Sequence, residues 1–339
     1  MAVPRAVIFG LAGPVLSPDE RRFFAATDPL GFILFARNIE TPDQVRALVA
    51  SLREAIGRAD APILIDQEGG RVQRLGAPHW RIAPPAARFG DLFARDPTGA
   101  IEAVRLNHRL LAADLSQLGI TVDCAPVLDV PVEGAHDVIG DRAFARDPAV
   151  VAHLGRAAVA GLLAGGVIPV VKHIPGHGRA FADSHKELPK VDVPQAALAA
   201  SDFVPFKALA GAPWAMTAHV RYAALDPALP ATQSKTVIEG IIRGAIGFGG
   251  VLVSDDLGMS ALAGNFRERA EACLGAGCDV VLHCGGDRTE MEAVAEGSAP
   301  LSEAAARRIA AAEIRRRKSL EPFDAAEARA RLDTLLAGT

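Results

Sequence analysis

The sequence predicts an α/β fold, a single-domain (β/α)8 TIM-type barrel with extra C-terminal helices. Eight apolar segments of strand length recur along the chain, and amphipathic stretches of helical length lie between most of them. Each apolar segment ends in a polar or glycine-bearing corner. Strands that are apolar almost throughout are buried on both faces, as in a parallel sheet covered by helices. A doubly wound open sheet is the alternative architecture.

The predicted strands and helices alternate along the chain. The strand segments are residues 6–10, 31–36, 62–66, 121–125, 167–173, 214–219, 250–255 and 279–283. The helical stretches include residues 41–57, 98–118, 148–163, 194–209, 235–246 and 260–276. Ser17, Thr41 and Asp147 each place a side-chain oxygen before a proline, as expected at the start of a helix. We assign residues 1–300 to the barrel and residues 301–339 to C-terminal helices packed on it, at 302–319 and 325–336.

The composition is that of a folded protein without an affinity for polyanions. Half of the 339 residues are apolar, which is ample for a hydrophobic core. The 36 basic and 40 acidic side chains leave a net charge of −4, so neither nucleic acid nor a membrane surface is an expected partner. No uncharged apolar run approaches the roughly 20 residues that cross a bilayer.

The cysteines and the first residues of the chain bear on location. The cysteines form no CxxC motif and are interpreted as reduced core thiols: Cys124, Cys273, Cys278 and Cys284. Residues 6–16 have the apolar character of a signal peptide, but no small-residue cleavage site follows them. We expect a cytoplasmic protein, and the sequence does not indicate its oligomeric state.

Polar side chains follow the predicted strands, where a parallel barrel carries its reactive groups. They comprise carboxylates, fixed cations and a close Asp/His pair: Asp66, Asp255, Asp256, Arg74, Arg142, Lys172, Asp183 and His185. Carboxylates accept hydrogen bonds from vicinal hydroxyls, and Arg and Lys donate to hydroxyl or carbonyl oxygens, so a sugar-like substrate suits this set. Chemistry at an anomeric carbon needs an attacking carboxylate and an acid for the leaving oxygen, tasks for which Asp255 and His185 are placed.

Four motifs carry a resemblance to a known family. They are DQEGGRVQR at 66–74, KHIPGHG at 172–178 with DSH at 183–185, AMTAH at 215–219 and VSDDLGM at 253–259. In this order the motifs resemble glycoside hydrolase family 3, and within it the single-domain bacterial β-N-acetylglucosaminidases (β-hexosaminidases) of peptidoglycan recycling. Two departures, Ile174 where the family usually has an aromatic and Gly285-Gly286 after Cys284, affect the expected shape of the pocket rim.

The resemblance implies a role for each matching residue. Asp255 is similar to the nucleophile that forms a covalent glycosyl-enzyme, His185 to the general acid/base, and Asp183 to the group that orients it. The residues similar to the sugar-binding shell are Asp66, Arg74, Arg142, Lys172 and His173. The implied activity is a retaining exo-β-N-acetylglucosaminidase acting on N-acetylglucosaminyl-1,6-anhydro-N-acetylmuramic acid with or without its peptide. The resemblance implies no metal and no cofactor.

The proton-transfer pair also has a physical basis. A histidine titrates near neutral pH, so His185 can give a proton in one step and take one in the next. Asp183, two residues away, can fix its tautomer and stabilise the imidazolium. Because Gly176 and Gly178 flank the start of this segment, we predict a mobile loop that closes over the substrate.

Several alternatives remain open at this stage. Asp255 could cap a helix beginning near Leu257, for which Asp256 is better placed. The cluster of His173, His177, Asp183 and His185 also fits a metal-dependent hydrolase on a TIM barrel. The remaining alternatives are a family 3 enzyme with another sugar specificity, a substrate-assisted mechanism, and a sugar-binding barrel without turnover. We interpret His219 as a hydrogen-bonded core histidine, and leave Asp129 and Glu68 outside the catalytic set as partners of nearby arginines.

Overall fold

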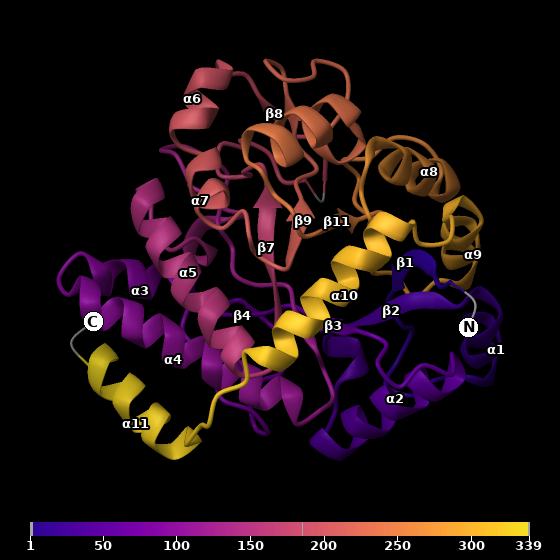
Figure 1. Cartoon of the computed structure of the whole chain (residues 1–339), viewed down its shortest axis with the longest axis horizontal. Coiled ribbons are helices and arrows are strands. Elements are labelled where there is room, and N and C mark those ends of the chain that lie inside the picture. The colour runs from indigo at the N-terminus through magenta and orange to yellow at the C-terminus, as the bar shows by residue number, and fades with distance from the viewer. Residues whose placement is uncertain (1–2, 185, 338–339) are drawn as a thin grey trace.

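The computed structural model describes residues 3–184 and 186–337, which form a closed barrel of parallel strands (Figure 1). β1 pairs with both β2 and β12, and this pairing closes the sheet. The predicted (β/α)8 architecture is therefore confirmed. Each predicted strand segment overlaps one barrel strand: β1 (Arg5–Phe9), β2 (Pro29–Leu34), β3 (Ile63–Ile65), β6 (Val122–Asp123), β7 (Ile168–Ile174), β9 (Trp214–Thr217), β11 (Val251–Asp256) and β12 (Val280–His283).

Helices surround the barrel. They are α1 (Pro18–Thr27), α2 (Pro42–Ala55), α3 (Ala86–Phe93), α4 (Pro97–Ser116), α5 (Pro148–Ala164), α6 (Gln195–Ala200), α7 (Phe203–Ala208), α8 (Phe266–Ala276), α9 (Arg288–Gly297), α10 (Glu303–Lys318) and α11 (Ala325–Leu336), with a π-helix at Thr236–Ala245. The predicted caps are confirmed, because Ser17, Thr41 and Asp147 each accept a backbone N–H from the first turn of their helix. Among the described residues, no helix has the length and apolar composition to cross a membrane.

Two predicted helices differ in the structure. The stretch 194–209 is split into α6 and α7, because Pro205 has no N–H to donate to the carbonyl of Ser201. The stretch 260–276 becomes helical only at Phe266, where Asn265 and Glu268 form a reciprocal capping box.

The interpretation of Asp255 or Asp256 as a helix cap is wrong. Residues 257–261 form turns, and no helix begins near Leu257. Oδ1 of Asp256 instead accepts the backbone N–H groups of Gly258 and Cys284, at 3.0 and 2.9 Å. This carboxylate therefore ties the end of β11 to the segment after β12.

The sequence did not predict two small sheets. An antiparallel hairpin of β4 (Gln67–Gly69) and β5 (Val72–Gln73) follows β3 directly, and β8 (Lys190–Val191) pairs with β10 (Arg221–Tyr222). Strands of two or three residues are too short to show an alternating pattern.

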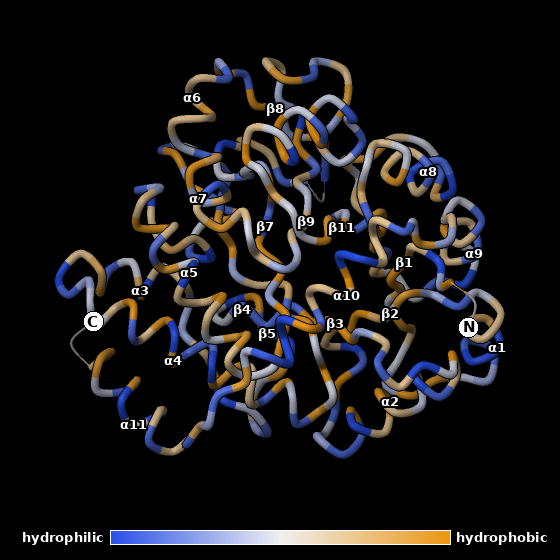
Figure 2. Tube along the Cα trace, viewed as in Figure 1, coloured by the Kyte–Doolittle hydropathy of each residue, from blue (hydrophilic) through white to orange (hydrophobic). Residues whose placement is uncertain are grey.

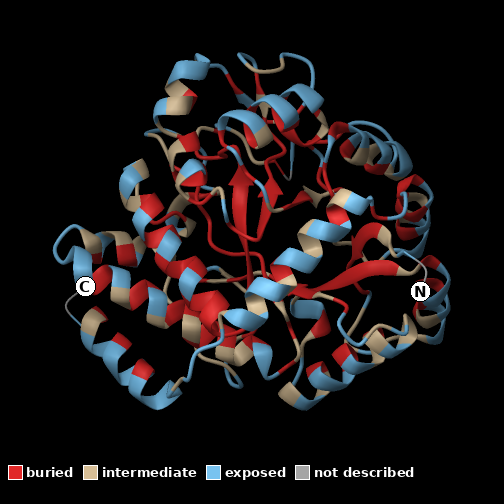
Figure 3. Cartoon of the chain, in the orientation of Figure 1, coloured by how far each residue is buried: buried red, intermediate tan, exposed pale blue. Residues whose placement is uncertain are grey.

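Both faces of the barrel sheet are buried (Figure 3). One apolar layer fills the interior and includes Ile8, Leu64, Val170, Val253 and Leu282. A second layer lies between the strands and the helices, whose hydrophilic residues alternate with hydrophobic ones along the chain trace (Figure 2).

Helix α10 covers the end of the barrel at which the strands begin. Leu301, Ala305 and Ala312 join the interior apolar layer, and Ile309 packs against it. Figure 1 shows α10 running across the strands in this view. With that end covered, the polar residues that follow the strands gather at the opposite end. Helix α11 packs on α4, where Arg331 pairs with Glu102.

Candidate active site

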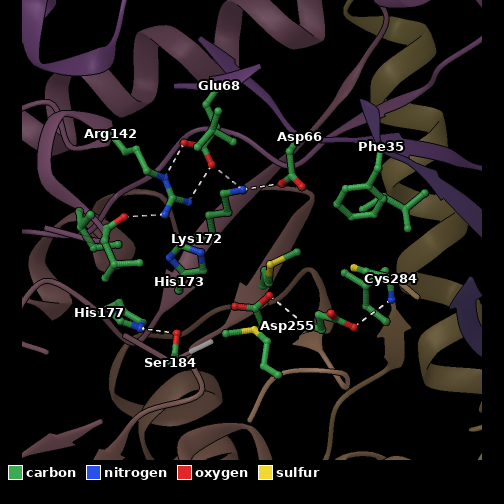
Figure 4. Close-up of a pocket in the computed structure, with 18 of the residues that line it drawn as sticks. Phe35, Asp66, Glu68, Arg142, Lys172, His173, His177, Ser184, Asp255 and Cys284 are labelled. Atoms are coloured by element: carbon green, nitrogen blue, oxygen red, sulfur yellow. Dashed lines mark hydrogen bonds and ion pairs between the residues drawn. The ribbon is translucent and has the colours of Figure 1, made fainter. Parts of the chain in front are cut away.

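A cavity of about 280 Å³ lies at the C-terminal ends of the barrel strands (Figure 4). Its wall is formed by side chains from β2, β7, β9, β11 and β12 and from segments that follow β2, β3, β6, β7, β11 and β12. Six of the predicted site residues line it: Asp66, Arg74, Arg142, Lys172, His173 and Asp255. Closure of the barrel thus brings together residues that are far apart in the sequence.

Lys172 is the central cation of the cavity. Its Nζ lies 2.8 Å from Oδ1 of Asp66 and 2.7 Å from Oε1 of Glu68. Arg74 approaches the other oxygen of Asp66 at 3.2 Å. Although burial alone would raise the pKa of Asp66, Lys172 and Arg74 hold it well below its usual range. The pKa of Lys172 is raised, because the two carboxylates outweigh its burial.

Glu68 lines the cavity and pairs with a nearby arginine, as expected from the sequence. Arg142 donates to both of its oxygens, with Nε at 2.9 Å and Nη2 at 2.8 Å. This bidentate pair fixes the guanidinium at the cavity wall, where its Nη1 also donates to the carbonyl of Val138. One signal in the sequence points to Glu68: in an extended segment, residues two apart face the same side, so Glu68 follows Asp66 into the cavity.

Asp255 lies at the end of β11 with its carboxylate toward the cavity (Figure 4). The backbone N–H of Asp256 donates to its Oδ1 at 2.8 Å. Burial would raise the pKa of Asp255, but His173, His219 and this N–H lower it below its usual value. At neutral pH the group is therefore an ionised carboxylate, the form required of a nucleophile.

Asp129 orients His173. From the sequence, Asp129 was instead expected to pair with an arginine. The ring Nδ1 of His173 lies 2.7 Å from Oδ2 of Asp129, a fully buried carboxylate. The other oxygen of Asp129 accepts the backbone N–H groups of His173 and His177. Since Nδ1 is engaged, Nε2 is the nitrogen of His173 left to contact a ligand. No local pattern in the sequence points to this pairing, because 44 residues separate the partners.

The segment after β7 carries the predicted proton-transfer pair. Ser184 is buried and lines the cavity, and its Oγ lies 3.1 Å from Nε2 of His177. Asp183 is half-buried, and its carbonyl accepts the N–H groups of Lys186 and Glu187. His185 lies outside the described residues. The roles of Asp183 and His185 and the mobility of this loop therefore stay predictions.

His219 is a hydrogen-bonded core histidine, as predicted. It is fully buried, with Nδ1 2.7 Å from Oγ1 of Thr232 and Nε2 3.0 Å from the carbonyl of Asp256. Burial lowers its pKa, which favours the neutral ring. Through the carbonyl of Asp256, His219 thus supports the end of β11, the strand that carries Asp255.

The charges of the cavity nearly cancel. Its lining includes Asp66, Glu68, Asp255 and Asp256 against Lys172, Arg74 and Arg142. Such a lining offers many donors and acceptors to a neutral polyhydroxylated ligand, and little net attraction to a polyanion. Phe35 is the aromatic residue of the lining. The guanidinium groups of Arg37 and Arg74 lie 5.0 and 5.2 Å from the centre of its ring.

A metal site was one alternative for the histidine cluster. In residues 3–184 and 186–337, no three His, Cys, Asp or Glu side chains are grouped to hold a metal ion. His173 and His177 have instead the partners described above, Asp129 and Ser184. The four cysteines are free thiols, and three of them are buried as expected, whereas Cys284 lines the cavity.

Comparison with known proteins bears on the family of this chain. The model of the glycosyl hydrolase family 3 N-terminal domain matches residues 19–315. A beta-hexosaminidase from Alkalilimnicola ehrlichii is 44% identical over 285 residues, which cover 82% of this chain and 80% of the relative. One from Xanthomonas campestris pv. campestris is 42% identical over 282 residues, 82% of this chain and 84% of the relative.

Among solved structures, NagZ from Neisseria gonorrhoeae in complex with N-trifluoroacetyl-D-glucosamine has a TM-score of 0.87 and 32% identity over 98% of both chains. The family match runs past residue 300 into α10, so the boundary predicted there remains a prediction. The resemblance seen in the four sequence motifs thus extends over residues 19–315, and the chain belongs to glycosyl hydrolase family 3.

Proposed function

We propose that this glycoside hydrolase is a retaining exo-β-N-acetylglucosaminidase. It removes terminal, non-reducing N-acetylglucosamine from peptidoglycan fragments, namely N-acetylglucosaminyl-1,6-anhydro-N-acetylmuramic acid with or without peptide. The β-N-acetylhexosaminidase activity is supported by relatives named beta-hexosaminidase at 42–44% identity and by the N-acetylglucosamine analogue bound in the Neisseria structure. The observation that carries the proposal is a single cavity that joins the Asp255 carboxylate to the cluster around Lys172.

The size and charge of the cavity favour one terminal sugar. Its volume of about 280 Å³ lies below the range of drug-sized ligand sites, so it suits a monosaccharide unit rather than a chain. We assign sugar binding to Asp66, Arg74, Arg142, Lys172 and His173. Asp66 accepts hydrogen bonds from hydroxyls, while the cations donate to hydroxyl and acetamido oxygens.

The first chemical step forms a glycosyl-enzyme. A carboxylate oxygen of Asp255 attacks the anomeric carbon while His185 donates a proton to the glycosidic oxygen, and the bond to the leaving sugar breaks. Asp183 holds the His185 ring and stabilises the imidazolium from which the proton comes. The product of this step is an ester between Asp255 and the sugar.

The second step releases the sugar. His185, now neutral, takes a proton from a water molecule whose oxygen attacks the anomeric carbon. Asp255 departs as a carboxylate, for which its lowered pKa makes it a good leaving group. Two inversions at the same carbon give net retention. The steps use side chains of this chain and water, and no cofactor.

The assay that tests the proposal is hydrolysis of 4-nitrophenyl N-acetyl-β-glucosaminide by the wild type and Asp255→Ala. We expect the variant to lose about 10³-fold or more in kcat, because the covalent route is removed. Asp43→Ala, an exposed change on α2, is the control. An Asp255→Ala enzyme with a tenth of the wild-type rate would show that another group attacks.

A second experiment separates the covalent route from substrate assistance. A slow fluorinated N-acetylglucosaminyl donor is expected to leave its sugar on the peptide that contains Asp255, as a mass increase in a digest. If the acetamido oxygen were the nucleophile, no adduct would form on Asp255. A nitrophenyl β-glucoside assayed in parallel tests the alternative sugar specificity, and release of sugar from the anhydro-muropeptide itself tests the assigned substrate.

We further propose that the enzyme acts in the cytoplasm, in peptidoglycan recycling and thus in cell-wall biogenesis, cell shape and division. Four free thiols are in keeping with a reducing compartment. The near-balance of charge in the cavity is in keeping with a small glycan partner rather than nucleic acid or membrane.

A further inference from the structure

The loop after β7 is held by contacts to the end of the barrel. Gly176 accepts the Tyr222 hydroxyl at 2.6 Å, and Gly178 accepts the N–H of Val132 at 3.2 Å. Gly178 is itself so close to Val130 that a Cβ there would lie 2.1 Å from the Val130 carbonyl oxygen. The start of the loop is therefore packed against neighbouring backbone.

His177 lies between these two glycines and depends on Asp129. The backbone N–H of His177 donates to Oδ1 of Asp129 at 2.6 Å, while Oδ2 of the same carboxylate lies 2.7 Å from the ring of His173. Asp129 is fully buried. One carboxylate thus fixes both the histidine assigned to sugar binding and the backbone from which the His177 ring projects.

The protonation of His177 determines what its ring can donate. Burial, with His173 nearby, lowers the pKa of His177 to about 4, so the ring is neutral at pH 7 and carries one N–H. Nδ1 is buried without a hydrogen-bond partner among the described residues, and Nε2 faces the Ser184 hydroxyl at 3.1 Å. A buried N–H without an acceptor is rarer than a buried acceptor without a donor. We therefore assign the proton to Nε2, which then donates to Oγ of Ser184.

Ser184 connects this histidine to the predicted proton-transfer pair. It is the residue between Asp183 and His185, and its buried side chain lines the cavity. We propose that His177 is a positioning residue for protonation of the leaving group: through its bond to Ser184 it fixes, at the cavity wall, the residue that precedes the predicted acid in the chain. This inference rests on the proposed function, in which His185 transfers the proton and Asp183 orients it.

A positioning role and a purely structural role affect different measurements. A bond that only stabilises the fold alters all substrates alike. A bond that positions the acid matters in proportion to the need of the leaving group for a proton, because a good leaving group departs without one. The comparison of two substrates therefore isolates the role of His177 from loss of folded protein.

The experiment measures kcat/KM for 2,4-dinitrophenyl and phenyl N-acetyl-β-glucosaminides. The variants are Ser184→Ala, His177→Phe, their combination, and Ser184→Thr, which keeps the hydroxyl. Ser298→Ala is the matched control, since this buried serine donates to Val294 and lies outside the cavity lining. His185→Ala reports directly on the assigned acid.

We expect Ser184→Ala and His177→Phe each to lose about tenfold on the phenyl substrate, the factor worth one hydrogen bond, and at most about twofold on the dinitrophenyl substrate. The combined variant should lose no more than either one, because both remove the same bond. Ser184→Thr should recover most of the phenyl activity, and Ser298→Ala should match the wild type on both substrates.

Two patterns would overturn the proposal in distinguishable ways. If His185→Ala shows the selective loss but Ser184→Ala and His177→Phe do not, or lose both substrates equally, the positioning role is wrong and the acid assignment stands. If His185→Ala lacks the selective loss, the acid assignment fails and the positioning role fails with it. Thermal melting of each variant identifies any that does not fold. In that case kcat/KM of Ser184→Thr on the phenyl and dinitrophenyl substrates decides the result.

Discussion

Replacing Lys172 by methionine tests the charge cluster of the cavity. Nζ of Lys172 contacts Asp66 and Glu68 at 2.8 and 2.7 Å, and only 3% of its side chain is exposed. Methionine keeps the length of the side chain but leaves two buried carboxylates without their shared cation. Breaking a buried ion pair in this way costs about 3–5 kcal/mol. Because Arg142 keeps Glu68 and Arg74 keeps Asp66, we expect the lower end, about 3 kcal/mol in the free energy of unfolding at pH 7.

The loss should depend on pH in a direction that follows from the pKa values. In the wild type, Lys172 is among the cations that hold the pKa of Asp66 and of Glu68 below their usual values against burial. This pairing stabilises the fold above the unfolded pKa values of about 4 and is lost as the pH falls through the lower folded values. Without Lys172 the effect of burial grows relative to that of the remaining cations, so the folded pKa values rise. The difference between the two proteins should therefore shrink from pH 7 toward pH 4.5.

Urea denaturation followed by circular dichroism at pH 7 and pH 4.5 measures both effects. Lys207→Met, an exposed lysine of α7, is the control and should differ from the wild type by less than about 0.5 kcal/mol. Adding Glu68→Gln to Lys172→Met should cost less than the sum of the single changes by at least about 1 kcal/mol, because the pair is in contact. A Lys172→Met loss below about 1 kcal/mol, or one that does not change with pH, would refute the reasoning.

Three further predictions concern single contacts. Asp129→Asn should lower kcat/KM by about 10- to 100-fold, since a hydrogen bond to a charged group is lost at His173; an unchanged rate would show that His173 needs no such partner. Arg142→Lys keeps the charge but not the bidentate pair with Glu68, and should raise KM by about tenfold with little change in kcat. Ser17→Ala removes the cap of α1 and should cost about 1 kcal/mol in thermal or urea unfolding while activity is kept, and a loss of activity would contradict its purely structural role.

The barrel strands and the starts of several helices could be predicted from local patterns in the sequence. Each barrel strand lies within or close to an apolar segment that the sequence marks, and the caps at Ser17, Thr41 and Asp147 occur where a capping oxygen precedes a proline. These features depend on neighbouring residues along the chain, so periodicity and turn chemistry suffice to predict them. The position of Asp66 and Asp255 at strand ends followed from the same patterning together with the barrel architecture.

The contacts among the site residues were decided by the tertiary structure. Asp66 and Lys172 are 106 residues apart, and Glu68 and Arg142 are 74 apart, so their pairing exists only because the barrel brings the C-terminal ends of β3, β6 and β7 to one rim. For the same reason the sequence did not show that Asp129 serves His173. His177 and Ser184 are only 7 residues apart, and their contact depends on how the loop after β7 folds back on itself. The residue types and their places at strand ends were determined by the sequence alone, whereas the partner of each charge was determined by distances across the barrel mouth, which no local pattern encodes.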